Sequence, residues 1–276
     1  MISYDFEYYK PLTLEEALQL FQELKRQEKD PIFFSGGTEI ITLGRLNQVR
    51  TGAVIDIKDI PECCVLERNQ QSLIIGAANT LTTIEESHLF PLLSKTVSEI
   101  ADRTARNKIT IGGNICGRIF YREAVLPFLL TGSQVVIASS EGNRTVPINE
   151  IFTEQLLLEP GELLVQIETK KNDLNLPFVS MKRRRQWDTG YPLITVAALK
   201  ADRDIRVAIS GLTHFPFRAI QMEAALNRTD LSSEQRAELA ISHLKVPVLN
   251  DTEGSSDYRL FVLKNTLQDV LMELGG

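Results

Sequence analysis

The chain has 276 residues, of which 43% are hydrophobic and 24% are charged, so it can bury the core of one large domain or two ordinary ones. Its formal net charge of −6 argues against the clustered positive surface that nucleic-acid binding requires. It contains no apolar stretch long enough to span a membrane, and its first residues lack the pattern of a signal peptide. We therefore expect a cytoplasmic protein with neither a nucleic-acid nor a membrane partner.

Cysteine and histidine are sparse. Cys63, Cys64 and Cys116 form no C-x-x-C pair, so the sequence predicts no disulfide framework, zinc site or iron–sulfur cluster. The three histidines are scattered and belong to no recognisable catalytic set. The sequence thus predicts no metal ligand and no catalytic acid, base or nucleophile, and we expect the cysteines to be reduced.

Helices and strands alternate along most of the chain. Thr13 is a predicted N-cap, and apolar residues then recur at helical spacing from Leu14 to Leu24. Strands are predicted over 32–34, 53–57, 72–76, 135–138, 163–168, 193–199 and 205–210. Further helices are predicted from near Thr83 and over 91–105, 124–130, 218–226, 233–244 and 258–274. The polar segment 170–175 separates two predicted α/β regions, the second of which ends in helices.

Two glycine pairs stand out. Ser35-Gly36-Gly37-Thr38-Glu39 directly follows a predicted strand, and Thr110-Ile111-Gly112-Gly113-Asn114 interrupts the predicted regular structure. Successive N–H groups in such turns can form a nest for an anion, and glycine leaves room for a ligand. Neither segment is a Rossmann fingerprint or a P-loop. One pair alone would be read as an ordinary tight turn, but two favour a clamp on a diphosphate.

An ordered set of motifs resembles the flavoprotein subunits of the xanthine dehydrogenase and carbon monoxide dehydrogenase family. The first glycine segment resembles the family's apolar-Ala-Gly-Gly-Thr-Asp loop, and Arg106-Asn107 followed by the second segment resembles its Arg-Asn before Thr-x-Gly-Gly-Asn. The remaining matches are Ile55-Asp56-Ile57, Ile75-Gly76-Ala77, Pro160-Gly161-Glu162-Leu163-Leu164 and Ser256-Asp257-Tyr258-Arg259. The resemblance covers nearly the whole chain.

The resemblance implies an α+β fold. A vanillyl-alcohol-oxidase-type (PCMH-type) FAD-binding domain of two α/β subdomains would occupy residues 1–176. A smaller α/β C-terminal domain, of the carbon monoxide dehydrogenase flavoprotein type, would occupy residues 177–276.

FAD is the implied cofactor. Its diphosphate and ribityl chain would be surrounded by Phe33, Phe34, Ser35, Gly36, Gly37, Thr38, Glu39 and Ile40 of the first loop and by Thr110, Ile111, Gly112, Gly113 and Asn114 of the second. The resemblance adds Glu123, where the family usually has an aspartate at the adenosine end, Leu164 as an apolar contact and Lys182 near the cofactor. We expect Arg183, Arg184 and Arg185 to form a solvated face.

The implied function is electron transfer within a molybdenum hydroxylase. Electrons would come from the 2Fe-2S clusters of a small partner subunit, after substrate oxidation on a molybdopterin-binding large subunit, and would leave to NAD or oxygen. Two alternatives stay open: a non-redox scaffold or nucleotide-binding module that keeps the fold, and a free-standing flavin oxidase.

Overall fold

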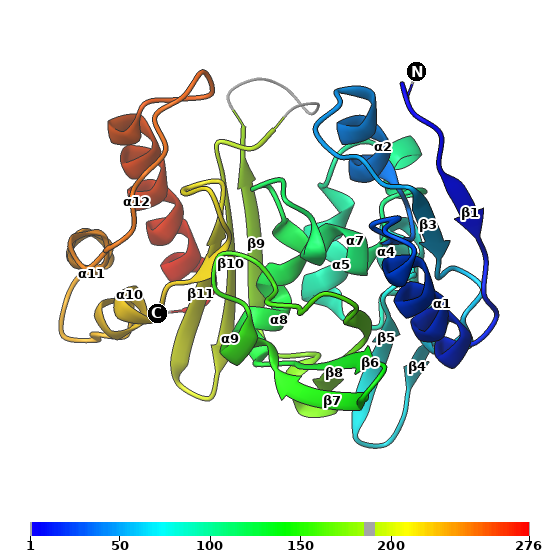
Figure 1. Cartoon of the computed structure of the whole chain (residues 1–276). Helices are drawn as coiled ribbons and strands as arrows, with labels where there is room; N and C mark the ends of the chain where they lie inside the picture. Colours follow the sequence, from blue (N-terminus) through cyan, green and yellow to red (C-terminus); the bar gives the residue numbers. More distant parts are fainter. Residues whose placement is uncertain (1, 185–190, 276) are drawn as a thin grey trace. The chain divides into compact units, whose positions relative to one another are not determined.

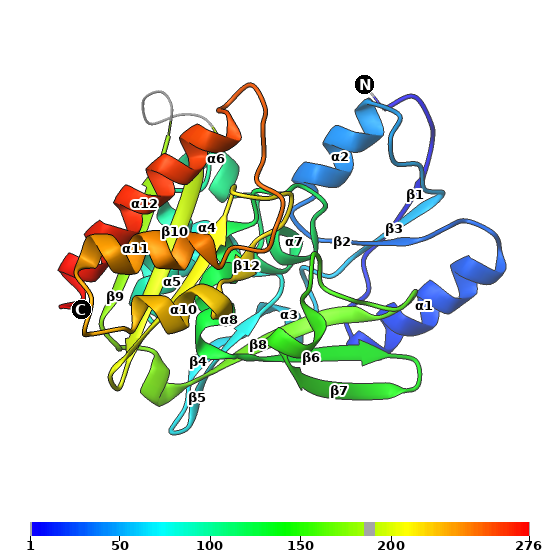
Figure 2. The same ribbon diagram turned by 90° about the vertical axis from the view of Figure 1, so that its left-hand side faces the viewer.

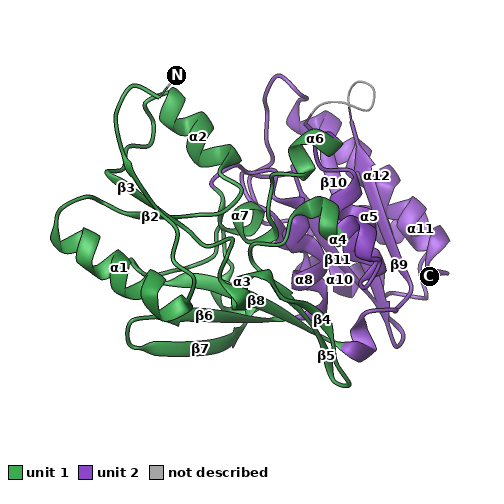
Figure 3. Ribbon diagram, turned by 90° about the vertical axis from the view of Figure 1, so that its right-hand side faces the viewer, with its two compact units in different colours: residues 1–84, 103–117, 133–170 green, residues 85–102, 118–132, 171–276 purple. Residues whose placement is uncertain are grey.

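The computed structural model describes residues 2–184 and 191–275, which form two compact units (Figure 3). Unit 1 comprises residues Met1–Ile84, Arg103–Gly117 and Ser133–Lys170, and unit 2 comprises Glu85–Asp102, Arg118–Gly132 and Lys171–Gly276. Both units combine helices with sheets, as the predicted α+β class requires. The predicted division at residue 176 stays a prediction, because compactness does not show which segments fold independently.

A small parallel sheet opens unit 1. Its strands, in spatial order, are β1 (Glu7–Tyr9), β3 (Ala53–Asp56) and β2 (Ile32–Phe34). Helix α1 (Leu14–Arg26) packs on β3 (Figure 1), burying Ala17, Leu18, Phe21 and Leu24, which share one helical face. The Thr13 hydroxyl accepts a hydrogen bond from the Glu16 amide at 3.2 Å, which confirms the predicted N-cap.

A second sheet in unit 1 is antiparallel throughout. Its order is β4 (Leu66–Arg68), β5 (Ser72–Gly76), β8 (Leu163–Lys170), β6 (Gln134–Ser139) and β7 (Gly142–Pro147). Two short helices, α3 (Pro61–Cys64) and α9 (Ile148–Ile151), accompany it. The two sheets of unit 1 fit the expectation of two α/β subdomains.

The short helices at the two glycine pairs were not predicted. In unit 1, α2 (Thr38–Arg45) starts immediately after the first pair, and α7 (Ile111–Cys116) contains the second. The single helix predicted over 91–105 is also wrong. It divides into α5 (Pro91–Ser98) and α6 (Arg103–Arg106), because Ala101 has a left-handed φ of 47°. Helix α4 (Leu81–Ser87) runs across the chain boundary between the units.

Unit 2 is built on an antiparallel sheet in the order β12 (Phe217–Arg218), β11 (Asp204–Ser210), β10 (Ile194–Ala201) and β9 (Phe178–Arg183). Strand β10 is buried on both faces, as a sheet covered by helices on each side requires. Figure 2 shows α10 (Ile220–Leu226), α11 (Ser233–Ser242) and α12 (Ser256–Glu273) over one face. Helices α5 and α8 (Leu126–Thr131) also contact the sheet, and two 3-10 turns, η1 (Glu123–Val125) and η2 (Lys171–Asp173), complete the unit.

Candidate functional site

The first glycine pair connects β2 to α2 and leaves polar groups without partners. Gly37 has φ 71° and ψ 0°, a left-handed conformation that suits glycine, and it is the N-cap of α2. Within the described residues, the N–H groups of Gly36, Gly37 and Thr38 have no hydrogen-bond acceptor, and the buried Ser35 hydroxyl has no partner either. The Ser35 hydroxyl is buried and would normally be paired, whereas the half-buried Gly36 and Gly37 and the exposed Thr38 are open to a ligand. Free N–H groups at a helix N-terminus match the needs of a phosphate.

The second glycine pair differs, and its prediction as an interruption of regular structure is wrong. It lies in the first turn of α7, where Thr110 is the N-cap and its hydroxyl accepts from the Gly113 amide at 3.3 Å. The amides of Ile111 and Gly112 donate to the Asn79 and Ala77 carbonyls, both at 2.9 Å, and that of Asn114 donates to the Thr110 carbonyl. The first four amides of α7 are therefore all bonded within unit 1.

The two glycines of the second pair face different surroundings. A Cβ on Gly112 would lie 2.6 Å from the Ala77 Cβ, so this glycine allows close packing. Gly113 is exposed, and a Cβ there would meet only the Thr110 hydroxyl, at 2.9 Å. Only the open side of Gly113 could accommodate a ligand.

The two glycine segments touch each other. A Cβ on Gly36 would lie 1.9 Å from the carbonyl oxygen of Lys108 and 3.3 Å from the Thr110 nitrogen. Beyond the first pair, Glu39 reaches the other end of α7, where its Oε2 would be 2.8 Å from a Cβ on Gly117. The structure thus brings both predicted segments together, although, counting partners within 2–184 and 191–275, the first alone offers unpaired backbone donors.

Four further apolar residues of unit 1 were predicted to contact FAD, and the structure places each of them. Phe33 stacks on Phe21 with ring centroids 4.9 Å apart, and the Phe34 ring lies directly against Gly37. Ile40 is half-buried on α2, and Leu164 is buried on β8 opposite Ile137.

Glu123 and Lys182 both belong to unit 2, where they form an ion pair. The Lys182 Nζ lies 2.8 Å from the Glu123 Oε1, and the two side chains are only 3% and 2% exposed. The same Nζ donates to the Glu99 carbonyl at 2.8 Å. Glu123 and Lys182, both predicted near the cofactor, thus contact each other, and their contact with FAD stays a prediction.

The basic run is only partly the solvated face that the sequence predicted. Lys182 on β9 and Arg184, the residue after the strand, both reach the Glu99 carbonyl at the C-terminal end of α5. Cations there complement the helix dipole. Arg183 points the other way and pairs with Asp269 on α12 at 2.5 Å. Arg185 lies outside the described residues.

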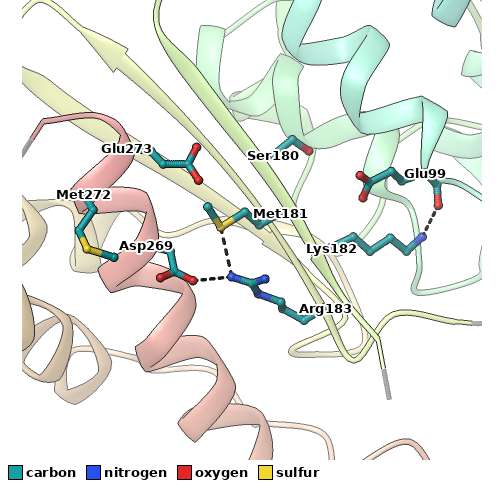
Figure 4. Close-up of a pocket in the computed structure, with 8 residues that line it drawn as sticks. All are labelled: Glu99, Ser180, Met181, Lys182, Arg183, Asp269, Met272 and Glu273. Carbon is teal, nitrogen blue, oxygen red and sulfur yellow. Dashed lines mark hydrogen bonds and ion pairs between the residues drawn. The ribbon is translucent and has the colours of Figure 1, made fainter. Parts of the chain in front are cut away.

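A surface hollow of about 470 Å³ adjoins this run in unit 2 (Figure 4). It is lined by Glu99, Ser180, Met181, Lys182, Arg183, Asp269, Met272 and Glu273. Its charged residues are three acids and two bases, and Arg183 pairs with Asp269, so the lining offers no excess of positive charge for an anionic ligand. None of them belongs to the glycine segments, so we do not assign the hollow to the diphosphate.

Comparison with known proteins identifies the family of this chain. Residues 4–169 match the family described as the FAD binding domain in molybdopterin dehydrogenase, a span that includes both glycine pairs. The chain belongs to this family. It is 31% identical to the xanthine dehydrogenase FAD-binding subunit of Escherichia coli O157:H7, over 98% of this chain and 96% of that protein. It is 25% identical to the nicotine 6-hydroxylase medium subunit of Paenarthrobacter nicotinovorans, over 98% and 97% of the two chains.

Solved structures agree on the fold. A carbon monoxide dehydrogenase from Hydrogenophaga pseudoflava that lacks the Mo-pyranopterin moiety matches with a TM-score of 0.88 and 24% identity, covering 100% of this chain and 99% of that one. The PCMH-type α+β fold and the FAD cofactor are thereby confirmed, and the chain is an FAD-binding oxidoreductase subunit of the molybdenum hydroxylase family. The unpaired donors of the first glycine segment fit this cofactor.

We expect the flavin to be bound without a covalent bond. Neither glycine pair contains a histidine or cysteine, and burial raises the pKa of Cys63 to about 12, so its reactive thiolate is disfavoured. Cys116 is exposed at the end of α7, so its thiol is the one that a covalent bond to the flavin would use. Denaturation should release all the yellow colour into the supernatant. Colour that stays with the precipitated chain, and is lost in Cys116→Ser, would contradict the prediction.

No helix among the described residues is both long and apolar enough to cross a bilayer.

Proposed function

We propose that this chain is the electron-transfer subunit of a xanthine dehydrogenase-type molybdenum hydroxylase that acts in purine metabolism. Substrate would be oxidised on a molybdopterin-binding large subunit, and electrons would pass through 2Fe-2S clusters on a small subunit to this chain and then to NAD or oxygen. The bound flavin supplies the redox chemistry, and the protein binds and orients it. The complex would be cytoplasmic.

One observation carries the choice of enzyme. The 31% identity with a xanthine dehydrogenase FAD-binding subunit extends over 98% of this chain, whereas the nicotine 6-hydroxylase subunit is 25% identical over the same share. The difference favours a purine over a pyridine-type substrate. The medium-subunit name of the nicotine enzyme supports a complex with other subunits.

At the residue level, we propose that the first glycine segment provides the backbone donors for the FAD diphosphate. Gly36, Gly37 and Thr38 would donate their N–H groups, and the Ser35 hydroxyl would add a side-chain donor. Thr110 to Asn114 would border the cofactor through the open side of Gly113, with Leu164 as an apolar support. Glu123 and Lys182 would contact the adenosine end of FAD as an ion pair rather than as two independent groups.

Co-purification tests the proposed complex. We expect the tagged chain, purified from its native host, to bring down two other polypeptides together with molybdenum, iron and FAD, and the complex to oxidise a purine. The matched control is the same chain purified alone from a heterologous host. It should hold FAD but no molybdenum or iron, and it should not oxidise a purine or an aldehyde.

The outcomes separate the alternatives. A lone flavoprotein that oxidises an organic substrate without either metal would identify a free-standing oxidase. A colourless chain that binds no flavin would identify a scaffold. A complex that oxidises nicotine or carbon monoxide but no purine would contradict only the proposed substrate. NAD reduction measured with and without oxygen would identify the acceptor.

A further inference from the structure

Lys58 was not singled out by any sequence motif, yet its ammonium group lies beside the first glycine segment. It follows β3 by two residues, and its Nζ donates to the Ser35 carbonyl at 3.0 Å. The same Nζ lies 2.6 Å from the Asp56 Oδ2 and 4.8 Å from the centroid of the Phe34 ring. A single charged group therefore contacts the residue before the glycine pair, the ring that covers Gly37 and an acid.

Asp56 holds Lys58 in this position. Its side chain is only 1% exposed, and it also accepts hydrogen bonds from the Lys58 amide at 3.0 Å and from the Tyr8 hydroxyl. Burial alone would raise the pKa of Asp56, but the hydrogen bonds from Lys58 and Tyr8 hold it below its ordinary value. The carboxylate is thus charged near neutral pH, and a buried charge requires its cation. The Lys58 ammonium is consequently fixed although its side chain is 41% exposed.

The bond to the Ser35 carbonyl determines the direction of the next N–H group. The carbonyl of Ser35 and the N–H of Gly36 belong to one planar trans peptide, so they point in opposite directions. Lys58 binds the oxygen, and the Gly36 N–H is therefore directed away from Lys58. The preceding peptide is held as well, because the Phe34 carbonyl accepts from the Ile57 amide at 2.9 Å. A cation on the carbonyl also polarises the peptide and strengthens its N–H as a donor.

We propose that Lys58, anchored by Asp56, is a positioning residue for FAD: it holds the Ser35–Gly36 peptide in the orientation that presents the Gly36 N–H to a phosphate. The proposal rests on the proposed role of the first glycine segment in binding the diphosphate. Lys58 acts through the Ser35 carbonyl and does not itself touch the cofactor. The buried Ser35 hydroxyl, which has no partner among the residues that the structure describes, is part of the same oriented residue.

The test compares five variants with the wild-type chain, each freed of flavin and titrated with FAD. One of them, Gly36→Ala, disturbs the glycine segment itself, because its Cβ would lie 1.9 Å from the Lys108 carbonyl oxygen. Lys58→Met removes the charge, and Lys58→Arg keeps it. Asp56→Asn combined with Lys58→Met removes both charges, so that no unpaired carboxylate is left buried if Lys58→Met alone fails to fold. Lys10→Met is the matched control, because Lys10 forms an ion pair of the same 2.6 Å length with Asp59 and is 45% exposed, but does not contact the glycine segment.

We expect Lys58→Met and the double variant to weaken FAD affinity about tenfold, which corresponds to weakening one hydrogen bond to a charged group. Lys58→Arg should recover most of the affinity, and Lys10→Met should match the wild type. Thermal unfolding of the flavin-free proteins separates this effect from a general loss of stability. The double variant should melt close to the wild type while still binding FAD weakly.

Two results would overturn the proposal. One is wild-type FAD affinity in the double variant. The other is equal weakening in Lys10→Met and Lys58→Met, which would indicate a diffuse effect of surface charge. If the double variant binds normally while Gly36→Ala does not, the positioning role fails and the role of the glycine segment stands. If Gly36→Ala also binds normally, the proposed site itself fails.

Discussion

Gly36→Ala is expected to abolish FAD binding, with a loss of affinity of about a hundredfold or more. The added Cβ would lie 1.9 Å from the Lys108 carbonyl oxygen and 2.9 Å from its carbon, and neither backbone atom can move like the end of a side chain. The segment must therefore shift, which misdirects the N–H groups of Gly36 and Gly37 together. Two hydrogen bonds to a charged phosphate, each worth about 1.5–3 kcal/mol, account for the size of the loss.

Flavin content per chain and titration of the flavin-free protein measure this effect. Gly142→Ala is the control, because a Cβ at that position, the first of β7, meets no atom of the described residues within 4 Å. Its φ of 130° makes a modest loss of stability expected, with no change in FAD affinity. Gly113→Ala provides a second comparison, since its Cβ would meet no backbone atom of the described residues and would press only on the Thr110 hydroxyl and on a bound ligand. A Gly36→Ala protein with a full complement of flavin would show that this close contact has no bearing on the cofactor.

Lys182→Ala is expected to lower the free energy of unfolding by about 3–5 kcal/mol, since it leaves the Glu123 carboxylate buried without its cation. Arg183→Ala is the matched comparison on the same strand. Its partner Asp269 is 39% exposed and Arg183 itself 40%, so solvent screens the pair and the expected loss is about 0.2–1 kcal/mol. Urea denaturation of the flavin-free proteins measures both. A Lys182→Ala protein as stable as Arg183→Ala would contradict the view that the buried pair matters.

A double variant, Lys182→Met with Glu123→Gln, separates stability from cofactor binding. Removing both charges should restore most of the stability, because two neutral side chains of similar size no longer carry a desolvation penalty. If the pair serves the adenosine end of FAD, this stable variant should still bind the cofactor weakly. If it binds FAD as tightly as the wild type, the pair is structural only, and the predicted contacts of Glu123 and Lys182 with the cofactor are wrong.

The sequence determined most of the regular elements and the position of the first glycine segment. Local patterns sufficed where short-range physics decides the conformation, as in α1, where Thr13 caps the helix and apolar residues recur on one face. The first glycine pair could likewise be located from the sequence, because it directly follows the apolar run of a predicted strand. The resemblance to the flavoprotein family rested on such local motifs, and the family match has since confirmed it.

Only the tertiary structure showed which residues far away in the sequence contact those motifs. The first turn of α7, which holds the second glycine pair, has its Ile111 and Gly112 amides bonded to the carbonyls of Asn79 and Ala77, more than thirty residues earlier in the chain. Lys182 and Glu123 are separated by 59 residues, and only packing reveals that each is the other's partner. Lys58 belongs to no motif, yet folding of β2 beside β3 places its charge on the Ser35 carbonyl. Helix and strand periodicities report only neighbours along the chain, whereas these contacts depend on where separate elements meet, and so they are not encoded in any local pattern.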